Sequence, residues 1–210
     1  MSEDHIFFAI NFVKTFSINY FVEILMDDKS KRRSLTIKRG KTLAFRPALS
    51  IFGIPIDKIA VNEDGVPFFM PVIINRLLDN TTQEGIFRIV GNKLTIDQLA
   101  KQACSKNFTI EENVTNYDLA SFIKQWLREL PTPIITPSVI NKYYKDESPI
   151  STKKILRHLA TVNRKCIAMI FSLIILISDQ SSINMMTLDN LFICILPSIM
   201  QTNKDLKVDF

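Results

Sequence analysis

The feature that most constrains the fold is an amphipathic run that ends in a proline. The stretch NYDLASFIKQWLRELPTP, residues 116–133, carries one apolar stripe, made of Leu119, Phe122, Ile123, Trp126, Leu127 and Leu130. Pro131 forces Leu130 out of the helical region and ends the helix. A helix with one apolar stripe must bury that stripe against other elements, so this segment predicts a packed helical core.

The rest of the chain favours the same fold class, all-α. Hydrophobic residues make up 47% of the sequence and there are only five glycines, which argues against wholesale disorder. Apolar residues at helical spacing predict further helices. We expect them from Pro67 to about Leu78, after a cap at Thr95, from about Thr152 to Val162, in an apolar run that ends near Ile177, and after a cap at Thr187 until Pro197 disrupts or ends the last one.

Charge divides the 210 residues into two parts, with a predicted boundary near Ser50. Residues 1–50 hold nine Lys/Arg and five Asp/Glu, a net charge of +4, whereas residues 51–210 hold seventeen and sixteen, a net charge of +1. We predict an N-terminal extension, 1–50, with an apolar segment and a basic linker, followed by a single helical domain, 51–210. The nearly neutral body argues against nucleic acid as a partner.

The inventory of reactive side chains argues against an enzyme that acts alone. The three cysteines lie far apart in apolar surroundings, as reduced core thiols of a cytoplasmic protein do, and the two histidines have no partner at metal-ligand spacing. We find no nucleophile with a base, no paired catalytic carboxylates and no phosphate-binding glycine loop. The sequence therefore predicts neither a metal site nor a cofactor site.

Cations stand out at two places. In EGIFRIVGN, Glu84–Asn92, Arg88 lies between two glycines in the connection between two predicted helices, where it is either an ordinary surface residue or a side chain presented to a partner. Lys124 and Arg128 are four residues apart, so they form a small positive ridge beside the apolar stripe of their helix. Such a ridge alone is most often solvated surface.

Three stretches together resemble the Rho GTPase-activating (RhoGAP) domain family over about residues 52–200. The first is GVPFFMPVIINRLL with EGIFRIVGN, similar to the glycine-valine-proline helix and GIFR loop of the family. The second is FIKQWLRELPTPII, similar to the helix end K-x-x-L-R-E-L-P-x-P. The third is INMMTLDNLFICILPSIM, a more divergent version of the late family motif.

The resemblance implies an all-helical, RhoGAP-like domain that docks on a GTP-bound Rho-family small GTPase and accelerates its GTP hydrolysis. Arg88 would be the arginine finger, the catalytic residue supplied in trans. Lys124 and Arg128 would line the partner-binding groove, with Arg128 either bracing the finger loop or contacting the partner, and Asn190 would contact the switch region. GTP and Mg²⁺ belong to the partner. The alternative is a scaffold module that binds a small GTPase without activating it.

Departures from the family pattern lie in the third motif and at the C-terminus. Met185 replaces the usual lysine, Leu196 a phenylalanine and Ser198 a frequent asparagine. The family normally continues with more helix beyond the position of Phe210, which leaves a domain truncated at its C-terminus as an open alternative. These departures point to altered affinity or partner choice before loss of catalysis.

The basic segment, residues 29–46, has eight Lys/Arg and follows an apolar stretch rich in aromatic residues. A solvated linker, a nuclear-import address and a kinase site at Ser34 are alternatives to a peripheral contact with an anionic membrane. The membrane hypothesis predicts that residues 1–210 co-sediment with anionic liposomes at low salt and that a fragment starting at Ser50 does not, because each cation near the surface contributes about 1 kcal/mol. Equal pelleting of both proteins, or of neither, would leave the segment as a linker.

Overall fold

The structure, a computed structural model, describes residues 50–136, 138, 139, 142, 155 and 157–201. The described chain is all-helical, as predicted, and its only β-type pairing there is an isolated bridge between Val61 and Pro67. Its helices are the 3₁₀ turn η2 (Ile56–Lys58), α3 (Phe69–Leu78), α4 (Lys93–Gln102), α5 (Asn116–Glu129), α8 (Thr161–Ser178), α9 (Ser181–Asn184) and α10 (Leu188–Met200). The predicted extension lies outside the described residues except for Ser50. Of the helix expected over 152–162, residues 152–154 and 156 also lie outside them. Its expected end at Val162 is wrong, because Leu159 and Ala160 are not helical and Val162 belongs to α8.

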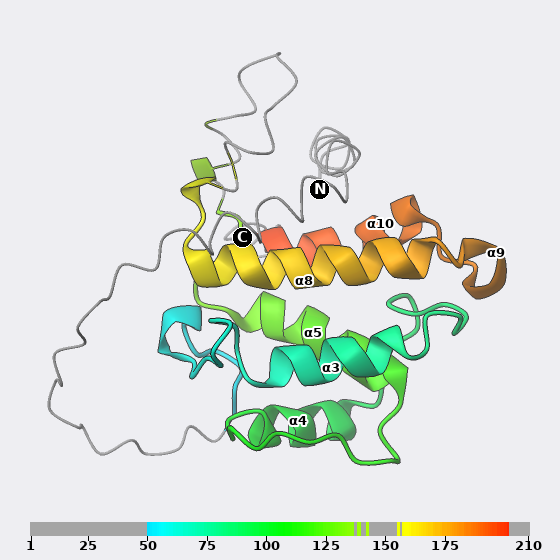
Figure 1. Ribbon diagram of the computed structural model, residues 1–210, viewed down its shortest axis with the longest axis horizontal. Coiled ribbons are helices and arrows are strands. Elements are labelled where there is room, and N and C mark those ends of the chain that lie inside the picture. The colour runs from blue at the N-terminus through cyan, green and yellow to red at the C-terminus, as the bar shows by residue number, and fades with distance from the viewer. Residues whose placement is uncertain (1–49, 137, 140–141, 143–154, 156, 202–210) are drawn as a thin grey trace, which may run out of the picture.

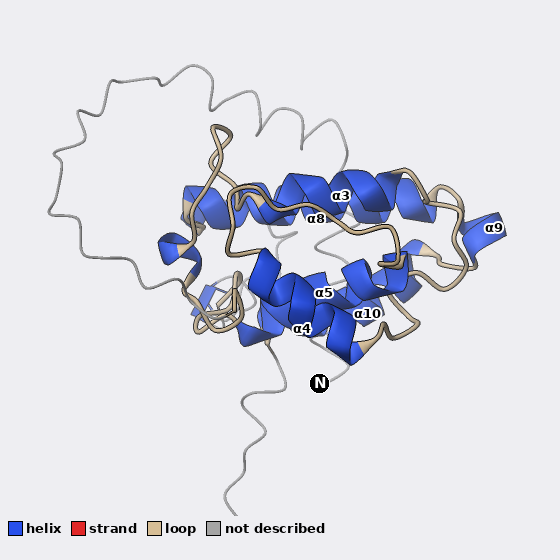
Figure 2. Cartoon of the chain, turned by 90° about the horizontal axis from the view of Figure 1, so that it is seen from below, coloured by secondary structure: helices blue, strands red, loops and turns tan. Residues whose placement is uncertain are grey.

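The helices stack in layers around α5 (Figure 1). In that view α8 and α10 lie above α3 and α5, and α4 lies below them. Helix α5 packs against α3, α4 and α10, while α8 packs against α3, α9 and α10. The view from below in Figure 2 shows the loops running over the outside of this stack. Because α5 contacts helices from both sides of the fold, its sequence determines how the others are arranged.

Helix α5 follows its sequence pattern closely. Its first turn carries a capping box in which Thr115 accepts from the N–H of Asp118 and the Asp118 carboxylate accepts from the N–H of Thr115. Its apolar stripe is buried, with Trp126 wholly inaccessible to solvent. The helix ends at Leu130, which adopts φ −58° and ψ 132° before Pro131, as the sequence predicted.

The end of α10 caps the end of α5. Gln201 is buried, and its Nε2 donates to the carbonyls of Leu127 (2.9 Å) and Leu130 (2.8 Å) at the C-terminal end of α5. Pro197 does not end α10, so that part of the expectation is wrong, because the helix continues to Met200. Proline removes the hydrogen bond to the carbonyl of Ile193, and Ile193 is 54% exposed, so water can reach that side of the helix.

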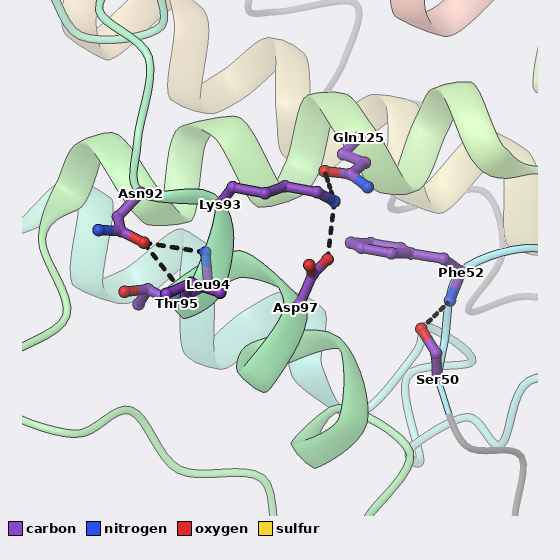
Figure 3. Close-up of polar contacts among 8 residues, drawn as sticks. All are labelled: Ser50, Phe52, Asn92, Lys93, Leu94, Thr95, Asp97 and Gln125. Carbon is purple, nitrogen blue, oxygen red and sulfur yellow. Dashed lines mark hydrogen bonds and ion pairs between the residues drawn. The ribbon is translucent and has the colours of Figure 1, made fainter.

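Two helix starts differ from the sequence prediction. Pro67 is not in the first turn of α3 but two residues before it, in the bridge with Val61. Helix α4 begins at Lys93 and is capped by Asn92, whose Oδ1 accepts from the N–H of Leu94 (2.9 Å) and Thr95 (3.3 Å) (Figure 3). The expected cap, Thr95, lies inside the first turn. The apolar pattern misplaced this start because Leu94 is 74% exposed and the inward-facing positions begin only at Ile96.

Helix α8 is long and apolar enough, by length and composition, to cross a membrane. In this fold it is a core helix, because residues from Cys166 to Ile177 along one side of it pack inside the helical stack. The buried positions are Cys166, Ile167, Ala168, Ile170, Phe171, Leu173, Ile174 and Ile177. The structure therefore confirms the helix expected in the apolar run that ends near Ile177 and places it in the core.

Phe69 lies at the centre of the aromatic core. Its ring makes edge-on contacts with Phe122 (5.4 Å between centroids) and Trp126 (5.2 Å), and it is wholly buried. We predict that Phe69→Ala lowers the free energy of unfolding by about 3–5 kcal/mol, because it leaves a cavity between α3 and α5. Phe68→Ala, at the half-buried neighbouring position, should cost clearly less. Urea denaturation of both variants measures the difference, and equal losses would contradict this account of the core.

Candidate functional site

The loop that carries Arg88, residues 84–92 and here called the Arg88 loop, turns two residues inward and the next three outward. Ile86 and Phe87 are wholly buried, whereas Arg88, Ile89 and Val90 are exposed. Phe87 has φ +67°, in the left-handed region that residues with a β-carbon rarely adopt. This backbone conformation allows the Phe87 ring to enter the core while the following side chain leaves the protein.

The two glycines of the loop have different roles. Gly85 has φ +67°, and its carbonyl accepts from the N–H groups of both Arg88 and Ile89, each at 2.9 Å, which closes the turn. Gly91 is needed for close approach, because a β-carbon there would lie 2.5 Å from Asp118 Cα on α5. The loop is therefore tightly bent at its start and pressed against α5 at its end.

Lys124 contacts the Arg88 loop directly. Its Nζ donates a short hydrogen bond to the carbonyl of Phe87, the residue before Arg88. Lys124 is half-buried. Burial lowers the pKa of its ammonium group, nearby Arg128 lowers the pKa further, and Cys194 opposes this shift.

Arg128 and Asn190 lie on the side of the site formed by α10. Arg128 is exposed, and its Nη1 donates to Ser198 Oγ (3.3 Å), so its described contact goes to α10 and not to the Arg88 loop. Of the two cations, Lys124 is therefore the one that braces the loop. Asn190 is exposed in the first turn of α10, on the face that also carries Cys194 and Ser198, one and two turns further on.

Electrostatics connect these groups. Burial raises the pKa of the Cys194 thiol, and the charges of Lys124 and Arg88 partly oppose that shift, which puts all three groups within electrostatic reach. Within the described residues, the ion pairs are Lys93 with Asp97 (2.7 Å) and Lys58 with Asp57 (3.3 Å). Neither involves Arg88, Lys124 or Arg128. The structure thus gathers three cations at one place without pairing them to an acid of the described residues, which suits a partner that brings negative charge.

Sequence reasoning missed Asn184, which fixes the start of the Arg88 loop. Its side chain is wholly buried, and its Nδ2 donates to the carbonyls of Thr81 (2.8 Å) and Ile177 (2.7 Å). The main-chain carbonyl of Asn184 accepts from the N–H of Gly85 (2.9 Å). Asn184 therefore joins the end of α8 to the loop. Its position in the third motif was the available signal, but the motif alone does not reveal this contact.

Comparison with known proteins identifies the family. The sequence profile of the RhoGAP domain matches residues 67–204. The chain belongs to the RhoGAP domain family. It is 30% identical over 164 residues to the Rho GTPase-activating protein gacA of Dictyostelium discoideum, covering 75% of this chain and 48% of that protein. It is 27% identical over 172 residues to the Rho GTPase-activating protein conundrum of Drosophila melanogaster, covering 71% and 27%.

Solved structures agree on the RhoGAP fold. Human Rho GTPase activating protein 15 superposes with a TM-score of 0.63 at 23% identity, covering 73% of this chain and 78% of that one. The BH domain of GRAF, a GTPase regulator associated with focal adhesion kinase, gives a TM-score of 0.55 at 19% identity, covering 63% and 79%. This chain spans about half or less of the length of the curated relatives named above.

The close approach of Gly91 to α5 predicts a stability effect. In Gly91→Ala the new methyl group would meet the α5 backbone at Asp118, which cannot retract, so the loop must shift. We expect a loss of about 1–3 kcal/mol in the free energy of unfolding, as for other overpacked sites. Val90→Ala on the same loop is the control: Val90 is 79% exposed, and it should change stability by less than about 0.5 kcal/mol. An unchanged midpoint for Gly91→Ala in urea denaturation would refute the close contact.

Proposed function

We propose that this RhoGAP domain activates a Rho-family small GTPase and that Arg88 is the arginine finger it supplies in trans. The observation that carries the proposal is the Arg88 loop itself: buried Ile86 and Phe87 hold the loop in the core while Arg88 points away from it. An exposed arginine on a rigidly held loop can enter the nucleotide site of a partner. Family membership supports a Rho-type GTPase as that partner.

The chemistry of GTP hydrolysis explains why the residue is arginine. Phosphoryl transfer spreads negative charge over the γ-phosphoryl oxygens and the leaving group, while the nucleotide and Mg²⁺ are held by the partner. A guanidinium stays charged at any physiological pH and can donate to two oxygens at once, which an ammonium does less well. Lys124 and Arg128 add positive charge beside it, and Asn190 is exposed on the adjoining face for contact with the partner.

Apolar residues beside Arg88 provide contact area for docking. Ile89 and Val90 follow it in the loop and are exposed, as is Leu94 at the start of α4. Exposed large apolar side chains grouped around a functional residue are typical of protein-binding surfaces. A cation flanked by apolar surface fits a partner that offers an apolar rim around a nucleotide phosphate.

The main alternative is a scaffold module that binds a small GTPase without activating it. The presence of Arg88 favours activation, because a pure binding role has no need for a guanidinium in the nucleotide site. In neither case do we expect the domain to hydrolyse GTP alone. We further propose a cytoplasmic location, with residues 29–46 as the membrane contact that the liposome experiment tests.

The finger assignment predicts that Arg88→Ala acts on the chemical step. At saturating concentration of the domain, single-turnover GTP hydrolysis by a panel of Rho, Rac and related GTPases should lose about 10³–10⁵-fold in stimulated rate. Binding to the partner loaded with a non-hydrolysable GTP analogue should weaken far less. Arg88→Lys should recover only a small part of the rate, because lysine keeps the charge without the two-pronged donor.

A matched control removes an arginine elsewhere. Arg157 is exposed and precedes α8, whereas the Arg88 loop contacts Asn184 beyond the other end of that helix. Arg157→Ala should leave the stimulated rate unchanged. Near-normal stimulation by Arg88→Ala would refute the finger, and tight binding without stimulation by the unaltered domain would favour the scaffold alternative.

A further inference from the structure

One face of α5 holds the backbone of the Arg88 loop at four points. Each contact joins an α5 side chain to a main-chain group of the loop, so it does not depend on the loop side chains. Tyr117 Oη donates to the carbonyl of Glu84 (2.9 Å), Lys124 Nζ donates to the carbonyl of Phe87, Ser121 Oγ accepts from the N–H of Gly91 (2.9 Å), and Asp118 Oδ1 accepts from the N–H of Asn92 (2.6 Å). We call Tyr117, Asp118, Ser121 and Lys124 the α5 clamp.

The spacing of the clamp explains how one helix reaches the whole loop. Tyr117, Ser121 and Lys124 are separated by four and three residues, so they lie along one face of α5, and Asp118 adjoins them. Asp118 and Ser121 are buried, and the second carboxylate oxygen of Asp118 accepts from Thr115 in the capping box. The clamp side chains are thus fixed by α5, whose own ends are capped.

The outward-facing part of the loop is held by turn hydrogen bonds to Gly85 but by no side chain of its own in the core. Arg88, Ile89 and Val90 are all exposed, so none of them anchors the backbone in the core. The clamp contacts fall on both sides of this exposed stretch, at Phe87 before it and at Gly91 after it. They therefore restrict where the Arg88 backbone can move.

We propose that Tyr117 and Ser121 are positioning residues that set the geometry of Arg88 through the loop backbone. This inference rests on the proposed function, because it gives the finger a fixed starting point for phosphoryl transfer. Neither side chain touches the reacting atoms. Both act through the loop backbone: Tyr117 holds Glu84 at the start of the loop, and Ser121 holds Gly91 directly after the exposed stretch.

The first test uses Tyr117→Phe and Ser121→Ala, each of which removes only a hydroxyl group. Misplacement of a reacting group by about 1 Å can cost up to about 100-fold in rate, so we expect at least a tenfold loss in the saturating stimulated rate for Ser121→Ala and a smaller loss for Tyr117→Phe. Affinity for the GTP-analogue-loaded partner should stay within about threefold, because an altered chemical step does not require altered binding.

The control is Ser50→Ala. Ser50 Oγ also accepts from a backbone N–H, that of Phe52 (3.2 Å), but next to the end of α4, where Ile51 bonds to Ala100, and not next to the loop (Figure 3). The rate of GTP hydrolysis stimulated by the Ser50→Ala variant should be unchanged. Losses for Ser50→Ala and Ser121→Ala of equal size would indicate a general structural effect and overturn the proposal.

The second test repeats Tyr117→Phe and Ser121→Ala in an Arg88→Ala background. If they act through Arg88, they should cause no further loss in the residual stimulated rate, because the group they position is gone. An equal fold-loss with and without Arg88, or a loss explained by weaker binding, would overturn the proposal.

Amide hydrogen exchange on the domain alone separates this inference from the proposed function. Ser121→Ala should accelerate exchange at the Gly91 N–H by about tenfold or more while core amides of α5 keep their protection, because only the loop opens locally. Unchanged exchange at Gly91 would refute the clamp. If the unaltered domain stimulates none of the GTPases yet Gly91 responds as expected, the proposed function fails while the contact between α5 and the loop stands.

Discussion

The burial of Phe87 in a left-handed backbone conformation is the constraint on which the site depends. A residue with a β-carbon in this conformation costs about 1–3 kcal/mol. Burying a phenylalanine side chain contributes about 1.5–3 kcal/mol, and the Lys124 ammonium adds a hydrogen bond to the Phe87 carbonyl. These terms nearly balance, so the strained conformation persists only while the core and Lys124 support it. Its consequence is the outward direction of Arg88.

The positive charge of half-buried Lys124 lowers the stability of the folded domain. Because burial lowers the pKa of Lys124, the folded chain binds this proton less tightly than the unfolded chain does. The buried charge therefore opposes folding at neutral pH, and this opposition weakens as the pH rises through the lowered pKa. Arg128 nearby acts in the same direction. An approaching anion would relieve both effects, so the unpaired cations are better matched to a bound partner than to the free domain.

The sequence predicted those features that depend only on the local pattern of residues within one helix or loop. The stripe and the proline of α5 determine its buried face and its end, and the glycines beside Arg88 fall in the connection predicted between two helices. Features that depend on tertiary contacts were missed. The α4 cap moved from Thr95 to Asn92 because the first turn of α4 faces solvent, and Lys124 proved half-buried because the Arg88 loop folds over it. The direction of Arg88 depends on the φ angle of Phe87, which no local pattern reveals.

The departures from the family pattern leave two described contacts of the site in place. Met185 replaces the usual lysine and is 57% exposed, while the preceding Asn184 keeps its bond to Gly85 and so holds the start of the Arg88 loop. Ser198 replaces a frequent asparagine and still accepts a hydrogen bond from Arg128. The framework of the third motif thus survives its divergence. Leu196 and Ser198 are buried, whereas at Met185 an outward-facing side chain changes from a cation to an apolar group, so Met185 is the departure that a partner would contact.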